Sequence, residues 1–195
     1  MYLQVIKSCL AKTFVFSFVA SVLTLSFTNN ALSQTDCDGE CRQNLADVRS
    51  ATAKYHRVEV ALADGYVADP VCVASPAGGM GIHYVNPTLT RDASFDIRQP
   101  EVLLYEPMKN GKLRLVAVEY FAPALVNGAP WFGMMPPAPP NQFAAAPRLF
   151  GQTFEGPMPG HNPAMPWHYE LHVWIWKNNS AGMFAQFNPA VQCSQ

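Results

Sequence analysis

The sequence predicts an α+β fold in which an N-terminal helix packs on an antiparallel β-sheet or a small β-barrel. Apolar side chains recur at helical spacing over residues 40–63, early in the chain. After Pro70 the pattern changes to short β-prone runs separated by turns rich in glycine, asparagine and proline. A helix followed by a series of strands is typical of this fold class.

The predicted helix at 40–63 has one mainly apolar face and a signal at each end. Asp38 can cap its start, and Gly65 can end it. His56 falls beside the apolar face, where we expect a solvated side chain. The residues at helical spacing are Leu45, Val48, Thr52, Tyr55, Val58, Glu59 and Leu62.

Six or seven strands are expected after the helix. Asn110 and Gly111 lie between two β-prone runs and form a strong hairpin signal. Residues 178–182 are expected to turn the chain between the last two strands. The expected strands cover residues 71–75, 82–85, 101–107, 113–121, 148–156, 167–177 and 183–187.

Two proline-rich loops, at 123–147 and 156–166, interrupt these strands. Residues 123–166 hold 11 of the 17 prolines, a composition that also occurs in disordered chains. The same stretch contains aromatic side chains, such as Trp131 and Phe143, that disordered linkers usually lack. We therefore expect ordered loops, and long ordered loops are often functional.

The first 33 residues have the features of a signal peptide. Lys7 and Lys12 precede an uncharged, mainly apolar run at 14–27, and the small-x-small sequence "ALS" ends at Ser33. The alternative is an uncleaved anchor, but the run is short for a membrane span of about 20 residues, and no later segment is long enough for one. Cleavage leaves residues 34–195 as a single periplasmic or secreted domain.

The exported chain carries few charges and no basic patch. Of the 13 lysines and arginines, Lys7 and Lys12 lie in the signal, which leaves 11 basic against 14 acidic residues. Nucleic acid is therefore not an expected partner, and no basic amphipathic helix indicates binding to a membrane surface. The expected partner is a small molecule or a metal ion.

Four cysteines follow the signal peptide, and an even number in an exported protein favours disulfides. Of the three pairings, we favour Cys37 with Cys41, in "CDGEC", and Cys72 with Cys193. The alternative is a thiolate metal site or a redox pair. However, "CDGEC" lacks the two-residue spacing of a CxxC motif, and no second close pair follows.

The stretch "PWHYELHVWIWKN", residues 166–178, places His168, Glu170 and His172 at alternate positions. Alternation with aromatic and β-branched residues indicates a strand, on which these side chains share one face. On a flat strand His168 and His172 would be roughly 13 Å apart, too far for both to bind one ion. Either Glu170 binds an ion with one histidine, or a bulge brings all three together.

Further ligands are expected from other strands. Small residues surround His83 in "GMGIHYV", and Glu119 lies on an otherwise apolar strand face, where a carboxylate must be paired or ligated. The expected metal ligands are His83, Glu119, His168 or Glu170, and His172. This set suits Zn²⁺, Fe²⁺ or Mn²⁺, and Glu119 or Glu170 could instead be a catalytic general base.

The leading interpretation is an exported metal-binding protein, or a metalloenzyme that acts on a small molecule. The alternative is a non-enzymatic periplasmic binding module in which the histidines and glutamates form a structural hydrogen-bonded network. Such a module could bind copper through Met134, Met135, Met158, His161 and Met165. It could instead hold a small ligand in an aromatic pocket, although ordinary core packing also explains such residues. The candidate pocket residues are Trp131, Trp174, Trp176 and Tyr84.

Several stretches resemble a group of uncharacterised secreted bacterial proteins: "GMGIHYVNP", "LLYEP", "LRLVAVEY", "FGQTFEGPMPGHNP" and "HYELHVWIWKNNSAGMFAQFNP". The resemblance covers most of the chain after about residue 50 and implies an exported single domain. The histidines are also loosely similar to cupin metal sites, but in the reverse order along the chain. A lone His83 comes early and "HYELH" comes late.

Overall fold

The structure, a computed structural model, describes residues 37–91, 94–139, 141–161 and 164–193. The expected signal peptide at 1–33 lies outside the described residues. The helical elements are α1 (Gly39–Thr52), η1 (Ala53–His56), α2 (Val58–Ala63) and η2 (Leu89–Arg91). The strands are β1 (Val67–Ser75), β2 (Gly78–Val85), β3 (Val102–Pro107), β4 (Leu113–Pro123), β5 (Leu125–Val126), β6 (Ala129–Pro130), β7 (Arg148–Leu149), β8 (Gln152–Thr153), β9 (Glu155–Met158) and β10 (His168–Val173).

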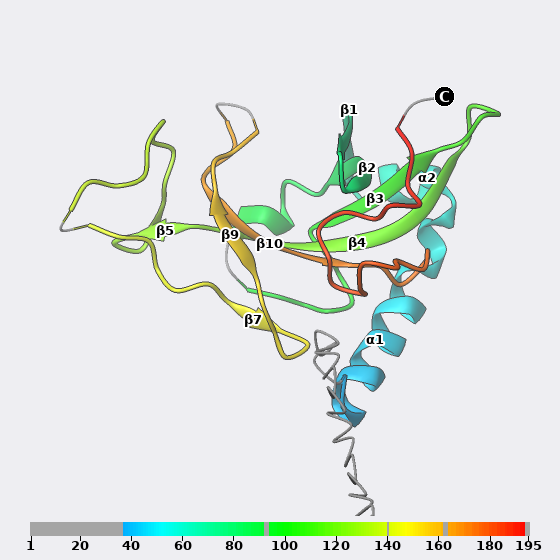
Figure 1. The fold of residues 1–195 in the computed structure, drawn as a ribbon, viewed down its shortest axis with the longest axis horizontal. Coiled ribbons are helices and arrows are strands. Elements are labelled where there is room, and N and C mark those ends of the chain that lie inside the picture. Colours follow the sequence, from blue (N-terminus) through cyan, green and yellow to red (C-terminus); the bar gives the residue numbers. More distant parts are fainter. Residues whose placement is uncertain (1–36, 92–93, 140, 162–163, 194–195) are drawn as a thin grey trace, which may run out of the picture. The chain divides into compact units, whose positions relative to one another are not determined.

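Six of the strands form one antiparallel sheet in the order β1-β2-β3-β4-β10-β9. Figure 1 shows this sheet curled into a half-barrel, with β1 and β9 as its edges. The β3–β4 hairpin turns at Asn110 and Gly111, and Gly111 has the positive φ, 74°, that glycine adopts without steric cost. The predicted α+β class with an antiparallel sheet is confirmed, and within the described residues the sheet is open rather than a closed barrel.

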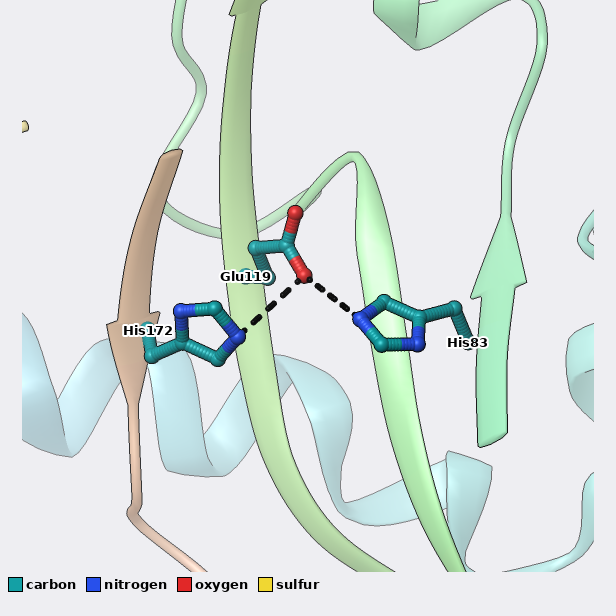
Figure 2. Close-up of side chains that lie close together, drawn as sticks. All are labelled: His83, Glu119 and His172. Atoms are coloured by element: carbon teal, nitrogen blue, oxygen red, sulfur yellow. Dashed lines mark ion pairs between the residues drawn. The ribbon is translucent and has the colours of Figure 1, made fainter. Parts of the chain in front are cut away.

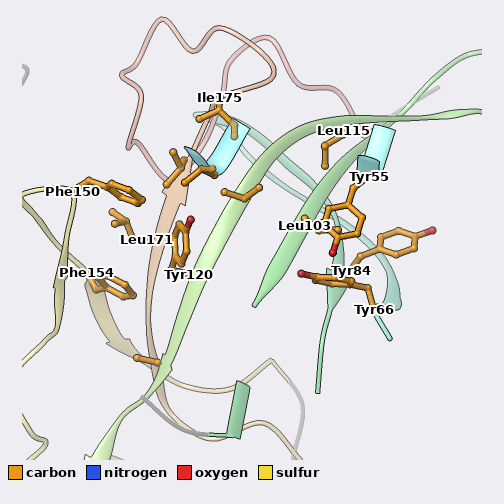
Figure 3. Close-up of a cluster of buried hydrophobic side chains, with 14 of the residues drawn as sticks. Tyr55, Tyr66, Tyr84, Leu103, Leu115, Tyr120, Phe150, Phe154, Leu171 and Ile175 are labelled. Carbon is orange, nitrogen blue, oxygen red and sulfur yellow. The ribbon is translucent and has the colours of Figure 1, made fainter. Parts of the chain in front are cut away.

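Alternation of side chains gives the sheet two different faces. The larger buried cluster joins Tyr55 of η1 to strand residues such as Leu103 and Tyr120 (Figure 3). The opposite face carries a smaller apolar cluster, which includes Val102 and Phe121. Burying each large apolar side chain contributes about 1.5–3 kcal/mol, so the two clusters fix the strand register that positions any site on the sheet.

The single long helix expected at 40–63 is interrupted. It begins as predicted at Asp38, whose side chain accepts a hydrogen bond from the backbone N–H of Cys41 at 2.8 Å. The chain then tightens into η1 and becomes extended at Arg57, with φ −99° and ψ 106°. At this break the carbonyl of Tyr55 accepts a hydrogen bond from the hydroxyl of Tyr105 at 2.6 Å. This long-range bond offsets a lost helical one, and the local apolar pattern does not encode it.

The prediction of strands at 167–177 and 183–187 is partly wrong. β10 ends at Val173, and residues 183–187 form no strand. The chain leaves the sheet at Trp174, whose backbone N–H donates to the carbonyl of Met183 at 2.9 Å. The indole of Trp174 donates to the carbonyl of Ala185 at 2.5 Å. The segment 183–187 therefore provides hydrogen-bond acceptors for a buried tryptophan instead of pairing as a strand.

Both favoured disulfides are present, Cys37–Cys41 and Cys72–Cys193. The second joins the edge strand β1 to the C-terminal segment across a sequence separation of 121 residues. Disulfides of this kind are typical of proteins in an oxidising compartment. In the part of the chain that the structure describes, no helix has both the length and the apolar character needed to cross a membrane.

Candidate metal centre

Three of the predicted ligands, His83, Glu119 and His172, come from the three strands β2, β4 and β10. His172 pairs directly with Glu119 across β10 and β4, so both side chains project from the same face of the sheet. His83 lies one strand further away, opposite Leu104 of β3. Its imidazole points across β3 towards the carboxylate of Glu119 (Figure 2). The sheet register thus brings together residues that are far apart in the sequence.

The three side chains converge on one buried point. Glu119 Oε2 lies 3.3 Å from His83 Nε2 and 3.6 Å from His172 Nε2 (Figure 2). One ligand atom from each residue lies within 4.8 Å of both others. Ligand atoms that surround a tetrahedral zinc ion lie about 3.4 Å apart, as bond lengths near 2.1 Å require. The arrangement is therefore compact enough to hold a metal ion after small adjustments.

The converging atoms have no hydrogen-bond partner. His83 Nε2, Glu119 Oε2 and His172 Nε2 are all buried, and none makes a hydrogen bond of good geometry to another described residue. Leaving one such buried atom unsatisfied costs about 1–3 kcal/mol, and folded proteins rarely do so. Three lone-pair donors that meet at one buried point could ligate a metal ion. His168 Nε2, which lies outside this group, is also buried without a hydrogen-bond partner among the described residues, so it is the convergence of the three atoms that distinguishes the group.

The electrostatic field at this point favours a cation. Burial lowers the pKa of the His83 imidazole, but the carboxylates of Glu119, Glu170 and Asp69 raise it by more, so this pKa lies above its ordinary value. The same negative charges that favour a protonated imidazole also favour a metal cation at that place. Binding of an ion would displace the proton, because histidine ligates metals in its neutral form.

Glu170 contacts the opposite edge of the His172 ring. The distance from His172 Nδ1 to Glu170 Oε1 is 3.8 Å, while His172 Nε2 faces Glu119. The side-chain amide of Gln186 donates to the same Glu170 oxygen at 2.8 Å. A carboxylate next to the second nitrogen of a ligating histidine fixes the orientation and tautomer of the ring. Glu170 is therefore placed to position His172, and it lies outside the three-residue group.

His168 is the predicted ligand that the structure does not bring into this group. Its Nδ1 donates to the carbonyl of Pro166 at 3.2 Å, and its ring stacks on Phe121. Its Nε2 lies 3.6 Å from Glu170 Oε2. Burial raises the pKa of Glu170, but the neighbouring His168 and His172 imidazoles lower it by more, so that this pKa lies below its ordinary range. The "HYELH" row therefore forms an alternating chain of imidazoles and an ionised carboxylate.

A cleft of about 720 Å³ opens beside the three residues. His83 and Glu119 line it, so two of the candidate ligands face the same open space. The remaining lining residues come mainly from β1 and from the chain around Met165. Small-molecule sites in proteins have volumes of about 300–1,000 Å³. A molecule in the cleft could therefore reach an ion held by the three side chains.

The aromatic residues expected to form a pocket lie apart, and none of them lines this cleft. Tyr84 belongs to the larger core cluster, because alternation directs it away from the face that carries His83. Trp174 belongs to the smaller cluster. The indole of Trp176 donates to the hydroxyl of Thr52, and that of Trp131 donates to a loop carbonyl.

The sulfur ligands expected for copper are also divided. Met134 and Met135 are 97% and 72% exposed on the first proline-rich loop. His161 and Met165 line the cleft, where the backbone N–H of His161 contacts the Met165 sulfur at 3.4 Å. Met158 lies on β9 and does not line the cleft, so the expected copper ligands are divided among the loop surface, β9 and the wall of the cleft.

Two residues of the site were not predicted. Gln186 reaches Glu170 only because the chain folds back after β10, and nothing in the local sequence indicates this contact. Asp69 lies on β1 and lines the cleft with His83. An acidic side chain within a β-prone stretch was the signal that could have pointed to it.

Comparisons of the chain with protein-family models, with curated proteins and with solved structures found no match. Without a match, the class of this protein is described only by the geometry of its fold and its candidate site. The chain is an α+β protein whose half-barrel sheet carries a buried cluster of two histidines and one glutamate, and this cluster could hold a metal ion.

Proposed function

We propose that this protein is an exported metal-binding protein, and that His83, Glu119 and His172 hold the ion. The observation that carries the proposal is the convergence of three buried ligand atoms that lack hydrogen-bond partners among the described residues. Because two of the ligands line the neighbouring cleft, the proposal extends to a metalloenzyme that acts on a small molecule.

Two imidazoles and one carboxylate form a donor set used by both zinc and non-haem iron sites. Zinc hydrolases use such a set with a water in the remaining position, and Fe²⁺ enzymes use it with open positions for substrate or oxygen. Mn²⁺ is compatible with the same ligands. An ion of this kind supplies Lewis-acid or redox chemistry when bound. Copper is the weaker alternative, because the methionines expected to bind it are divided: Met134 and Met135 are exposed on the first proline-rich loop, whereas Met165 lines the cleft.

The neighbouring residues have separable roles in this proposal. Glu170 orients the His172 ring and stays ionised, while Gln186 holds one of its oxygens in place. His168 extends the same chain and donates to the backbone at Pro166. We assign these residues to the support of the metal ligands rather than to contact with substrate.

Export rests on two supporting features. The sequence at 1–33 has the pattern of a cleavable signal peptide, and the two disulfides are typical of an oxidising compartment.

The proposal is tested by elemental analysis of protein exported into a bacterial periplasm and purified without a histidine tag. We expect about one equivalent of a divalent metal in the wild type and a loss of that metal in His172→Ala. His56→Ala is the matched control, because His56 is an exposed histidine on η1 that lies outside the cluster. Circular dichroism would establish that each variant is folded.

Two outcomes would contradict the proposal. One is wild-type protein that binds no metal even after incubation with Zn²⁺, Fe²⁺ or Mn²⁺. The other is a folded His172→Ala variant that retains as much metal as the His56→Ala control. The first result would leave the cluster as a buried structural network and the protein as a binding module at most, and the second would show that the metal binds elsewhere.

A further inference from the structure

The cleft beside the three-residue group has apolar walls. Valines from the first three strands line it, together with Phe121, Met165 and several prolines. Val67 and Val71 lie on the edge strand β1 and are 59% and 61% exposed, so they offer apolar surface that the protein itself does not cover. Such a surface next to a polar site is typical of a pocket for an apolar molecule.

The charged groups of the cleft are all acidic or imidazole. Asp69 lines the wall on β1, and Glu119 lines the floor with His83. No lysine or arginine occurs among the described residues that line the cleft. Sites that recognise carboxylates or phosphates usually supply arginine or lysine, or backbone N–H groups at a helix N-terminus. The helices α1 and α2 contribute no lining residue.

From this arrangement we infer that the cleft takes an uncharged, mainly apolar small molecule that presents one oxygen donor, such as an amide, ketone or alcohol, to the ion. The inference rests on the proposed function, because the ion is the partner of that oxygen. The apolar walls remove the body of the molecule from water, which favours binding. The carboxylates of Glu119, Glu170 and Asp69 together carry three negative charges, against two positive charges on a divalent ion, so an anionic molecule of the same shape would add negative charge that nothing lining the cleft compensates.

The experiment compares two probes of nearly the same shape, 4-ethylbenzamide and 4-ethylbenzoate, on zinc-loaded full-length exported protein. Zinc content is measured first, and binding is then followed by titration calorimetry at neutral pH. We expect the amide to bind at least 10-fold more tightly than the carboxylate. Acetamide, which has the same donor without the apolar body, should bind at least 10-fold more weakly than 4-ethylbenzamide.

Variants of Asp69 test the origin of this preference. Asp69→Asn keeps a side-chain oxygen for the hydrogen bond that Asp69 Oδ1 accepts from the backbone N–H of Val71, and removes only the charge. We expect Asp69→Asn to reduce the ratio of amide affinity to carboxylate affinity. We expect Asp69→Lys to abolish or reverse the preference for the amide. Glu59→Lys, at an exposed position of α2 that does not line the cleft, makes the same change in charge and should leave the preference unchanged.

The outcomes separate this inference from the proposed function. Protein that binds zinc but prefers the benzoate, binds neither aromatic probe, or shows no effect of Asp69→Lys overturns the inference and leaves the metal site intact. Protein that binds none of Zn²⁺, Fe²⁺ and Mn²⁺ overturns the proposed function, and the inference with it; where Fe²⁺ or Mn²⁺ binds and zinc does not, the same probes are measured on protein loaded with that ion. An amide preference that Asp69→Lys removes and Glu59→Lys does not remove supports the assignment.

Discussion

His172 lies directly opposite Glu119 across β10 and β4, with 3.6 Å between His172 Nε2 and Glu119 Oε2. The same carboxylate oxygen lies 3.3 Å from His83 Nε2, so Glu119 is the centre of the group and each histidine approaches it from a different side (Figure 2). A buried carboxylate between two imidazoles is costly unless its charge is compensated. A divalent ion would supply that compensation.

Replacing Glu119 should therefore remove the ion without greatly changing the shape of the site. We expect Glu119→Gln to lower the metal affinity by on the order of 100-fold or more, because a direct ligand matters at least as much as a neighbouring group. The affinity is measured by competition with a chromophoric chelator. Glu59→Gln, at an exposed position of α2, is the control and should bind metal like the wild type. Equal affinity in Glu119→Gln and the control would exclude Glu119 as a ligand.

The sequence indicated the residues of the candidate site more readily than the strand pairing that brings them together. The alternation in "HYELH" placed Glu170 and His172 on one face, and β10 confirms that they lie on one strand. Glu119 was also among the expected ligands, but its position opposite His172 could not be derived, because the register of β10 on β4 is set across the long segment between the two strands. The expected distance along a flat strand agrees with the position of His168 outside the group of His83, Glu119 and His172.

Long-range hydrogen bonds account for the parts of the fold that the sequence did not predict. The helix breaks where the carbonyl of Tyr55 accepts a hydrogen bond from the hydroxyl of Tyr105. The last strand ends where the indole of Trp174 donates a hydrogen bond to the carbonyl of Ala185. Both bonds join residues distant in the sequence or in a different element, whereas periodicity reports only on neighbours. The β3–β4 hairpin was predictable because its turn residues are adjacent.

A second prediction concerns Glu170, which we assign to positioning. Glu170→Gln should keep about one equivalent of metal but lower the affinity by about 10–100-fold, because the second nitrogen of His172 loses its anionic partner. The matched variant is Gln186→Leu, which removes only the hydrogen bond to Glu170 Oε1 and should have a smaller effect in the same direction. Complete loss of metal in Glu170→Gln would indicate a direct ligand instead.

The two disulfides should differ in their contribution to stability. In the chain-entropy model, the Cys72–Cys193 bond closes a loop with a sequence separation of 121 residues and contributes about 5 kcal/mol. The Cys37–Cys41 bond spans only four residues and contributes roughly 2 kcal/mol. We therefore expect the Cys72→Ser/Cys193→Ser variant to be the less stable of the two double variants in urea unfolding. The reverse order would show that strain or packing, rather than loop closure, dominates.

The last prediction concerns acid stability and another buried carboxylate, Glu106, near the end of β3. Its side chain forms ion pairs with Arg114 and with Lys177, and its Oε1 lies 2.8 Å from Lys177 Nζ. Burial raises the pKa of Glu106, but Lys177 and Arg114 lower it by more, so this pKa lies below its ordinary value. A carboxyl whose pKa is lowered by folding stabilises the protein above its unfolded pKa of about 4.3, and this contribution disappears as the pH falls through the folded pKa.

Glu106→Gln should therefore be less stable than the wild type at neutral pH, and the difference in the free energy of unfolding should shrink as the pH falls from about 5 to 3. Urea unfolding at a series of pH values measures this difference, with Glu59→Gln as the exposed control. A stability difference that stays constant over this range would mean that Glu106 acts through packing and hydrogen bonds, such as the one it accepts from the backbone N–H of Gln192, and not through its charge.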